Sequence, residues 1–334
     1  MPTTSRKRVL ATIRGDATDR PPISFWGHVY DRESSAEDLV AHTLERWQRH
    51  RWDWVKLNPR KHYHVEPWGV RYDYSGVPAG KPVVADYPVR TPADWDAIGE
   101  VAADAGALGE QLEAVRMLRS RLPAEVPLLQ TVFTPIAILA ELTEPPESLR
   151  DLLDAEPERV ARALEAVTRT FERYVTEVMR AGADGLYLAT VDWGSRAFVT
   201  PEQLRRWSRP YDLRLLAAAG ASPFHTVHVC KGDARVSEFA DYPVGAFSWD
   251  ASAPGNPTLA EGLARVRGAV VGGIGHETDL QHGPGAVLAA YRRGLAATGG
   301  RRWMVAPGCS MPPATPDETL AALRAEVERG PGAA

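Results

Sequence analysis

The stretch that decides the fold is PERVARALEAVTRTFERYVTEVMRAGADGLYLAT, residues 157–190. Its first part places apolar side chains three or four residues apart with charges on the other face, which predicts an amphipathic helix over Pro157–Met179. After a short loop, the apolar run Gly185–Thr190 is typical of a buried strand. A helix that leads directly into a buried strand is the repeating unit of proteins built on a parallel sheet.

The same alternation continues on both sides of this stretch. Further helices are predicted over Pro201–Ala219, Thr258–Val266, Pro284–Ala297 and Asp317–Glu328. Eight short apolar runs are interpreted as strands: Ile23–His28, Trp54–Asn58, Pro127–Phe133, Gly185–Thr190, Phe224–Cys230, Val244–Asp250, Ala269–Ile274 and Trp303–Cys309. Eight strands that alternate with helices predict an α/β protein with a (β/α)8 barrel. An open doubly wound sheet is the alternative, but no Gly-x-Gly-x-x-Gly motif follows the first strand.

We predict a single barrel domain over residues 1–334, with a short extension before the first strand. The chain is longer than the ~250 residues typical of this fold. The irregular stretch Pro59–Asp96 is rich in Pro, Gly and Tyr, and it predicts an elaborated loop or hairpin after the second strand. With the helical region that follows, this insertion covers residues 59–125.

The composition excludes several classes of protein. A formal net charge of -4 without a long basic run argues against a nucleic-acid partner. No run approaches the ~18 apolar residues of a membrane-spanning helix, and no apolar segment of a signal peptide follows the basic start. Two cysteines do not make a disulfide framework, so we expect a cytoplasmic protein with reduced thiols.

Both cysteines lie where a metal site would need them. His228 and Cys230 are two residues apart, so they point the same way from the end of one strand, and Cys309 ends another strand. In barrel enzymes the active site lies at the carboxyl ends of the strands. One nitrogen and two sulfurs are a zinc ligand set, and three protein ligands leave the fourth position open for catalysis. Two small buried cysteines and a structural histidine are the alternative.

Other polar and aromatic residues fall at or just beyond the predicted strand ends. Asp192 and His28 are candidates for catalytic work, because both lie at such ends. Trp26, Lys56, Asn58, Trp193 and Tyr211 are candidates for substrate binding. A buried structural pair is the alternative for Lys56 and Asn58, packing is the alternative for the tryptophans, and packing is favoured for Tyr211 because it lies on a predicted helix. Asp250 follows the sixth predicted strand.

A second alternating histidine pair, His62-Tyr-His64, offers a competing metal site. Barrel hydrolases use such a pair on their first strand together with an aspartate on their last strand. Here the pair follows the second strand and the eighth strand ends in Cys309. The sequence therefore favours a role in a surface loop or in the substrate pocket for His62 and His64 over a metal-dependent hydrolase.

Several short motifs, in this order and spacing, make the chain similar to the uroporphyrinogen decarboxylase-like superfamily of (β/α)8 barrels. They are Asp19-Arg20-Pro21-Pro22, Phe133-Thr-Pro135, Ala181-Gly-Ala-Asp-Gly185, Thr200-Pro-Glu202, Pro210-Tyr-Asp212, His228-Val-Cys230-Lys-Gly232, Gly272-Gly-Ile274 and Ala306-Pro-Gly-Cys309. The resemblance extends over nearly the whole chain. It is strongest to the branch of zinc-dependent cobamide and thiol methyltransferases.

This resemblance implies that His228, Cys230 and Cys309 bind Zn²⁺, with Asp250 as a fourth, acidic ligand. The implied activity is transfer of a methyl group from a corrinoid, or another activated donor, to a small-molecule thiol bound to the zinc. Since no part of the chain resembles a cobalamin-binding domain, a corrinoid would arrive on a separate protein. The resemblance also implies a homodimer. The true decarboxylases carry an Arg-rich stretch after the first strand, whereas this chain has Trp26-Gly-His-Val-Tyr-Asp31.

Two other functions remain open from the sequence. One is a metal-free lyase or decarboxylase that acts on a small carboxylic acid, with Asp192 or His28 moving the proton. The other is a binding or corrinoid-handling module without enzymatic activity. Metal content and methyl transfer to a thiol distinguish these functions from the methyltransferase.

Overall fold

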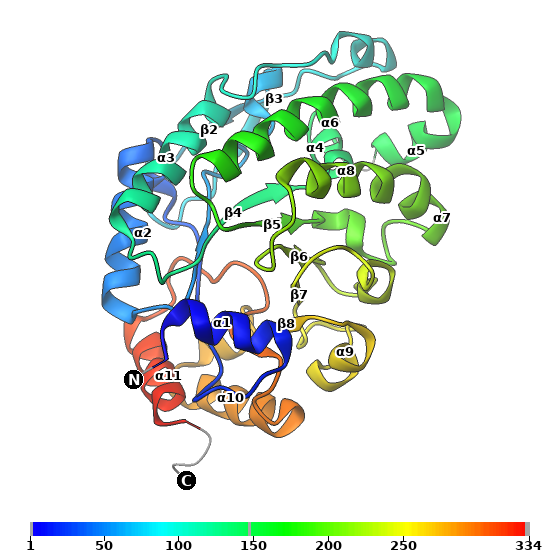
Figure 1. Cartoon of the computed structure of the whole chain (residues 1–334). Coiled ribbons are helices and arrows are strands. Elements are labelled where there is room, and N and C mark those ends of the chain that lie inside the picture. Colours follow the sequence, from blue (N-terminus) through cyan, green and yellow to red (C-terminus); the bar gives the residue numbers. More distant parts are fainter. Residues whose placement is uncertain (1–2, 146–147, 331–334) are drawn as a thin grey trace.

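The computed structural model describes residues 3–145 and 148–330, and its centre is a curled parallel sheet of seven strands (Figure 1). The strand order is β1-β4-β5-β6-β7-β8-β9. Their bounds are β1 Val55–Leu57, β4 Leu128–Phe133, β5 Gly185–Ala189, β6 Thr226–His228, β7 Ala246–Ser248, β8 Ala269–Ile274 and β9 Trp303–Pro307. Seven of the eight predicted strands are thereby confirmed as members of one parallel sheet.

The first predicted strand, Ile23–His28, forms isolated bridges instead of a strand. Ile23 pairs with Val305 of β9, and Gly27 pairs with Met311. On its other side the Ile23 carbonyl accepts a hydrogen bond from the Asp53 backbone N–H, just before β1. The prolines at 21 and 22 have no N–H to donate, which shortens any ladder that starts there. The segment nevertheless connects the two edges of the curled sheet, and the result is a barrel-like fold.

Helices cover the outside of the sheet (Figure 1). They are α1 Ser5–Arg14, α2 Ala36–His50, α3 Ala107–Arg121, α4 Pro135–Ala140, α5 Ser148–Ala155, α6 Pro157–Arg180, α7 Pro201–Gln203, α8 Arg209–Ala219, α9 Leu259–Arg265, α10 Pro284–Thr298 and α11 Asp317–Arg329. Thr258 caps α9 through a reciprocal hydrogen-bond pair with Glu261. None of the helices in the described ranges is long and apolar enough to cross a membrane.

The helix predicted over Pro201–Ala219 is interrupted. A π-helical turn, Leu204–Ser208, separates α7 from α8. Pro210 lies at the start of α8 and lacks the N–H that a continuous α-helix would use, so the backbone widens by one residue before it.

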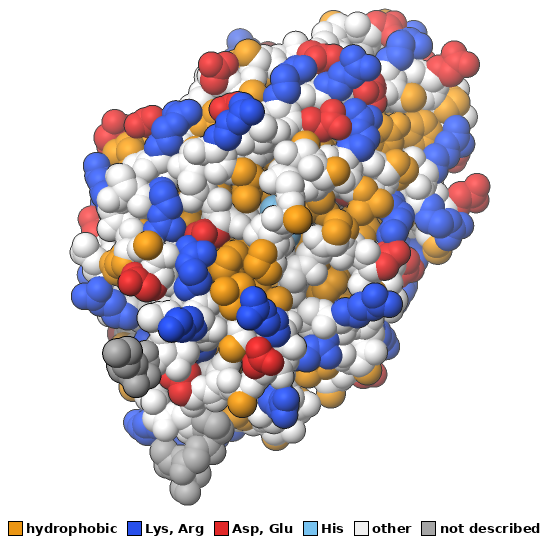
Figure 2. Space-filling model, in the orientation of Figure 1, with side chains coloured by type: hydrophobic (Ala, Val, Ile, Leu, Met, Phe, Trp, Pro, Cys, Tyr) orange, Lys and Arg blue, Asp and Glu red, His pale blue; other side chains and the backbone are white. Residues whose placement is uncertain are grey.

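The region between β1 and β4 contains an antiparallel hairpin, β2 Arg71–Asp73 with β3 Val83–Asp86, and then α3. The hairpin lies outside the parallel sheet. Charged side chains of both signs are interspersed over the molecular surface (Figure 2), as expected for a net charge of -4.

Two sets of buried apolar side chains hold the fold together. The larger set lies between the helices and the outer face of the sheet. The smaller set fills the inside of the curl, with Trp26, Trp54, Leu129, Tyr187 and Met304 among its members. Because neighbouring residues of a strand point to opposite faces, the inward positions stack above one another toward the carboxyl ends of the strands. Those ends form the floor of the site described below.

Candidate active site

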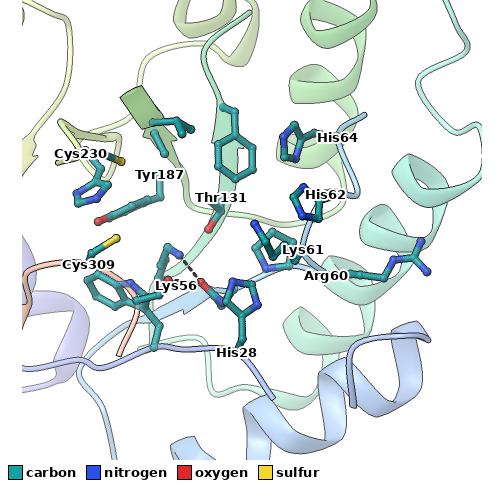
Figure 3. A pocket seen from close by; sticks show the side chains of 18 of the residues that line it. His28, Lys56, Arg60, Lys61, His62, His64, Thr131, Tyr187, Cys230 and Cys309 are labelled. Atoms are coloured by element: carbon teal, nitrogen blue, oxygen red, sulfur yellow. Dashed lines mark hydrogen bonds between the residues drawn. The ribbon is translucent and has the colours of Figure 1, made fainter. Parts of the chain in front are cut away.

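A cavity of about 170 Å³ opens at the carboxyl ends of the strands (Figure 3). Its walls come from β1, β4, β5, β6 and β9 and from the loops that follow them. The lining residues are Trp26, His28, Lys56, Asn58, Pro59, Arg60, Lys61, His62, His64, Thr131, Phe133, Glu141, Tyr187, Ala189, Val191, His228, Cys230, Cys309 and Ser310.

The two cysteines lie on the same side of this cavity, beside Tyr187 (Figure 3). Cys230 follows β6 and Cys309 follows β9, three strands further around the sheet. A hydrogen bond between the two thiols and the nearby His228 lower the pKa of Cys309 well below its ordinary value. The same thiol contact, together with burial, raises the pKa of Cys230 well above its ordinary value. Of the two thiols, Cys309 therefore ionises more readily, while Cys230 keeps its proton.

His228 is held by a chain of two hydrogen bonds. Its Nδ1 lies 3.0 Å from Ser248 Oγ, which lies 3.0 Å from the Tyr187 hydroxyl. All three side chains are buried. The other ring nitrogen, Nε2, is buried and has no hydrogen-bond partner among the described residues. A buried imidazole nitrogen without a partner costs free energy unless something binds it.

These donors suit a zinc ion chemically. Zinc sites commonly combine cysteine thiolates with a histidine whose second ring nitrogen is held by a hydrogen bond, as Ser248 holds His228 here. Within residues 3–145 and 148–330, however, no three His, Cys, Asp or Glu side chains lie at metal-binding spacing.

Asp250, the predicted fourth ligand, points elsewhere. Its carboxylate lies 3.0 Å from His276 Nδ1 and accepts hydrogen bonds from the backbone and side chain of Ser252. Burial raises the pKa of Asp250, but the contacts with His276 and Ser252 lower it by more, so the pKa lies below its ordinary value and the carboxylate is ionised. Asp250 does not line the cavity. Zinc ligation by Asp250 stays a prediction that requires it to leave His276.

His276 was not among the predicted site residues. It follows β8 in the loop after Gly275, where no alternating pattern marks it. Burial lowers the pKa of His276, whereas Asp250 and the negative charge near Cys309 raise it by more. The raised pKa favours the protonated form of His276 near the thiol pair.

Trp26, Lys56 and Asn58 come together in the cavity. Lys56 is buried, its Nζ donates to Asn58 Oδ1 at 2.7 Å, and it lies over the rings of Trp26 and Tyr187 at 5.3 and 4.9 Å. Burial lowers the pKa of Lys56 to about 7, against the raising effect of the two cysteine sulfurs. The amine can thus be neutral or charged near physiological pH.

His28 also lines the cavity, and a buried glutamate binds its ring. Its Nδ1 lies 2.9 Å from both carboxylate oxygens of Glu33, whose side chain is 1% exposed. The backbone N–H of Val29 also donates to Glu33, and the ring of Tyr30 stacks on His28 at 4.8 Å. No pattern in the sequence indicated Glu33, because the contact is local to an irregular loop.

His62 and His64 share one carboxylate. His64 Nε2 lies 3.0 Å and His62 Nδ1 lies 3.4 Å from Glu141 Oε2, at the far end of the cavity from the thiols (Figure 3). Burial raises the pKa of Glu141, but the two histidines hold it well below its ordinary value. The pair therefore belongs to the pocket wall.

The remaining predicted residues lie outside this cavity. Asp192 and Trp193 line a neighbouring pocket behind His62 and Glu141. Tyr211 is on α8, where the guanidinium of Arg214 packs over its ring at 6.0 Å. Their assignment to catalysis or substrate binding stays a prediction.

Comparison with known proteins places the chain among relatives of one family. The model of the uroporphyrinogen decarboxylase (URO-D) family matches residues 4–330. Uroporphyrinogen decarboxylases of Geobacter sp. (strain M21) and Syntrophotalea carbinolica are 28% and 30% identical, over 52% and 50% of this chain and 50% and 48% of theirs. The chain thus spans about half the length of these curated relatives.

Methyltransferases are also among the similar proteins. Methylcobamide:CoM methyltransferase MtaA of Methanosarcina barkeri is 25% identical over 64% of this chain and 61% of its own length. A solved methyltransferase from Methanosarcina mazei has a TM-score of 0.84 at 21% identity and covers 98% of both chains. At that identity the structural likeness shows the shared fold.

Proposed function

Because the chain belongs to the uroporphyrinogen decarboxylase family, we propose that it is the methyltransferase type of member, which moves a methyl group to a thiol held by zinc. One observation carries the proposal. A buried His228 Nε2 without a partner shares a cavity with the chain's two thiols, at the carboxyl ends of the strands. Two cysteines that only filled the core would not explain why the Nε2 atom of His228 is buried without a hydrogen-bond partner.

In this proposal His228, Cys230 and Cys309 hold the zinc. When bound, zinc supplies a Lewis acid that lowers the pKa of a coordinated thiol. Two thiolates and a neutral imidazole leave the site uncharged, so the ion keeps much of its acidity. The positive charge of His276 nearby favours the ionised form of Cys309.

The substrate thiol must lose a proton, and we assign its acceptance to His28. Since Glu33 occupies Nδ1 of His28, the free Nε2 is the acceptor. The S–H bond breaks and its electron pair stays on sulfur. The thiolate then forms a new bond to the methyl carbon, while the bond from that carbon to the donor breaks and leaves its pair on the donor.

The other cavity residues have substrate-positioning roles in this proposal. Lys56 and Asn58 present a donor and an acceptor beside the ring of Trp26, next to the thiol pair. The methyl donor is a corrinoid on a separate protein or a small methylated compound. The name of the Methanosarcina barkeri relative includes a methylcobamide, which supports the former.

Metal content tests the proposal directly. We expect about one zinc per chain in protein purified without chelators, and its loss in Cys309→Ser. Ser310→Ala is the matched control, because Ser310 lines the same cavity one residue away and its hydroxyl contacts Asn58. If the wild-type protein binds no zinc even after reconstitution, the methyltransferase proposal is wrong.

One observation favours a second candidate, a metal-free decarboxylase. Arg60 and Lys61 line the cavity, and a carboxylate substrate would pair with them. The family also takes its name from a decarboxylase. Release of CO₂ from a carboxylic acid by zinc-free protein would support this candidate over methyl transfer.

A further inference from the structure

A second pocket of about 180 Å³ lies directly behind the cavity with the thiols. It shares His62, Glu141 and Val191 with that cavity, so these three residues form the wall between them. The other lining residues are Tyr72, Val84, Tyr87, Ala137, Ala140, Asp192, Trp193 and Phe198. The second pocket is as large as the first, and the proposed methyl transfer does not use it.

Aromatic rings and methyl groups make up most of its surface. Tyr72 of β2 stacks on His62 at 3.9 Å with an angle of 8° between the rings. Trp193 and Phe198 meet edge to face at 5.4 Å. Ala137 and Ala140 of α4 are small and buried, and they leave the space open on the helix side. The first cavity differs in polarity, because the basic side chains of Lys56, Arg60 and Lys61 line it.

The carboxylates that line the second pocket already have partners. Glu141 is bound by His62 and His64, and Asp192 pairs with Lys231 at 3.3 Å. Burial lowers the pKa of His62 to about 4, despite its bond to Glu141, so this ring is uncharged at neutral pH. Arg150 also lies 5.5 Å from the ring of Phe198. Among the described residues, both carboxylates that line the second pocket therefore have a hydrogen-bond or ion-pair partner.

We propose that this second pocket binds an uncharged aromatic ring of the substrate, whose reacting group lies in the cavity with the thiols. A flat ring fits a space walled by ring faces and edges, and such contacts add to the burial of its apolar surface. The assignment of the reacting group rests on the proposed function, whereas binding of the ring does not.

Binding of three small probes to the purified wild-type protein tests this inference without metal, thiol or turnover. The probes are 2-phenylethanol, the neutral aliphatic 3,3-dimethyl-1-butanol and its cationic isostere choline. By ligand-detected NMR we expect 2-phenylethanol to bind at least about tenfold more tightly than either of the others, about 1.4 kcal/mol. A failure of zinc binding elsewhere would leave this result untouched.

Two variants locate the binding. Ala140→Leu puts a larger side chain into the second pocket and should weaken 2-phenylethanol binding by about tenfold or more. Ala137→Leu is an independent second filling variant, in case the first does not fold. Glu113→Gln is the control, because Glu113 lines neither pocket, and it should leave 2-phenylethanol binding unchanged.

Three results would overturn the inference. Tighter binding of choline would make the pocket a site for organic cations. Equal binding of 2-phenylethanol by wild-type protein and both filled variants would place the ring elsewhere. Absence of binding by any probe would leave the pocket a solvent-filled hollow.

Discussion

A single hydrogen bond sets which nitrogen of His228 faces the thiols. Ser248 Oγ binds Nδ1 and is itself held by the Tyr187 hydroxyl, so the ring cannot flip without breaking a buried chain. Outer hydrogen bonds of this kind fix the tautomer and orientation of a ligating histidine. In the proposed zinc site, the affinity for the metal would thus depend on a serine that is not itself a ligand.

Ser248→Ala should therefore weaken zinc binding while the three ligands stay in place. We expect a loss of about 10–100-fold in affinity, measured by competition with a chelator of known affinity. Ser248→Thr keeps a hydroxyl and should restore most of the loss. Ser120→Ala, an exposed serine on α3, is the control. Unchanged affinity in Ser248→Ala would show that packing alone orients His228.

Asp212 makes stability depend on pH. The carboxyl is fully buried, and burial raises its pKa to about 7 although Ser208 and Tyr242 donate to it. Its ordinary pKa is 3.8, so between pH 4 and pH 7 the folded state binds more protons than the unfolded state. The stability of the folded protein thus falls as pH rises through this window and levels off above it.

Asp212→Asn removes the titration and should change the pH profile of the unfolding free energy. Relative to wild type, the variant should gain about 2–4 kcal/mol between pH 4 and pH 8, since each pKa unit corresponds to about 1.4 kcal/mol. Urea unfolding at both pH values measures this difference. A constant offset between the two proteins at both pH values would contradict the raised pKa.

At the scale of elements, helix α10 packs very closely on strand β9. A Cβ at Gly294 would lie 2.5 Å from ring atoms of Trp303, the first residue of β9. Trp303 is fully buried and its indole N–H donates to Gly272 O, so the ring cannot move aside. The absence of a side chain at 294 allows this approach of helix and strand.

Two substitutions on α10 separate packing from helix propensity. Gly294→Ala should destabilise the protein by about 1–3 kcal/mol, because the added methyl overfills the contact with Trp303. Gly285→Ala is the matched control: a Cβ there meets nothing within 4 Å, so it should be neutral or stabilise by up to about 1 kcal/mol. Thermal unfolding of both variants measures the contrast. Equal effects would mean that Trp303 has room to shift.

The elements were largely predictable, because their signals are local. Strands buried on both faces leave continuous apolar runs, and seven of these were read correctly. Proline accounts for both departures: it limits Ile23–His28 to bridges and divides the helix at 201–219. In the site, His28, Trp26, Lys56, Asn58, His228 and both cysteines line one cavity as predicted positions at strand ends. Glu33, Glu141, Ser248 and His276 escaped prediction, because a hydrogen bond between distant or irregular segments leaves no periodic trace.

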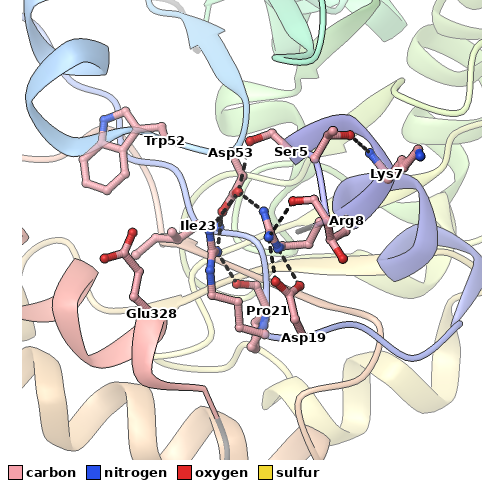
Figure 4. A network of polar contacts seen from close by, with 12 residues as sticks. Ser5, Lys7, Arg8, Asp19, Pro21, Ile23, Trp52, Asp53 and Glu328 are labelled. Carbon is pink, nitrogen blue, oxygen red and sulfur yellow. Dashed lines mark hydrogen bonds and ion pairs between the residues drawn. The ribbon is translucent and has the colours of Figure 1, made fainter. Parts of the chain in front are cut away.

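At the scale of the whole molecule, one buried carboxylate joins segments from both ends of the chain (Figure 4). Asp53 is 1% exposed and precedes β1. It accepts hydrogen bonds from Arg8 of α1 at 2.7 Å, from Arg20 at 2.6 Å and from the backbone N–H of Ile23 at 2.9 Å. Arg324 of α11 approaches it at 3.4 Å. These contacts hold the segment that connects β9 to β1 across the edges of the sheet.

The charge of Asp53 is secured by these partners. Burial raises its pKa, but Arg20, Arg8 and Arg324 lower it by more, so the folded-state pKa is below the ordinary value of 3.8. The stabilising contribution is therefore present above pH 4 and is lost as pH falls further. The guanidinium of Arg8 has a second partner in Asp19, whereas that of Arg20 depends mainly on Asp53.

Asp53→Asn should consequently loosen the closure of the whole fold. Removing one charge from a buried ion network leaves the arginines uncompensated and costs about 3–5 kcal/mol, measured by urea unfolding at neutral pH. Glu113→Gln is the control, because Glu113 and Arg116 form an exposed pair on α3 that should contribute less than ~1 kcal/mol. Hydrogen exchange should show the loss concentrated at α1, α11 and residues 23–24. If the loss is small, or spreads evenly over the seven strands, then β-sheet pairing rather than this network closes the fold.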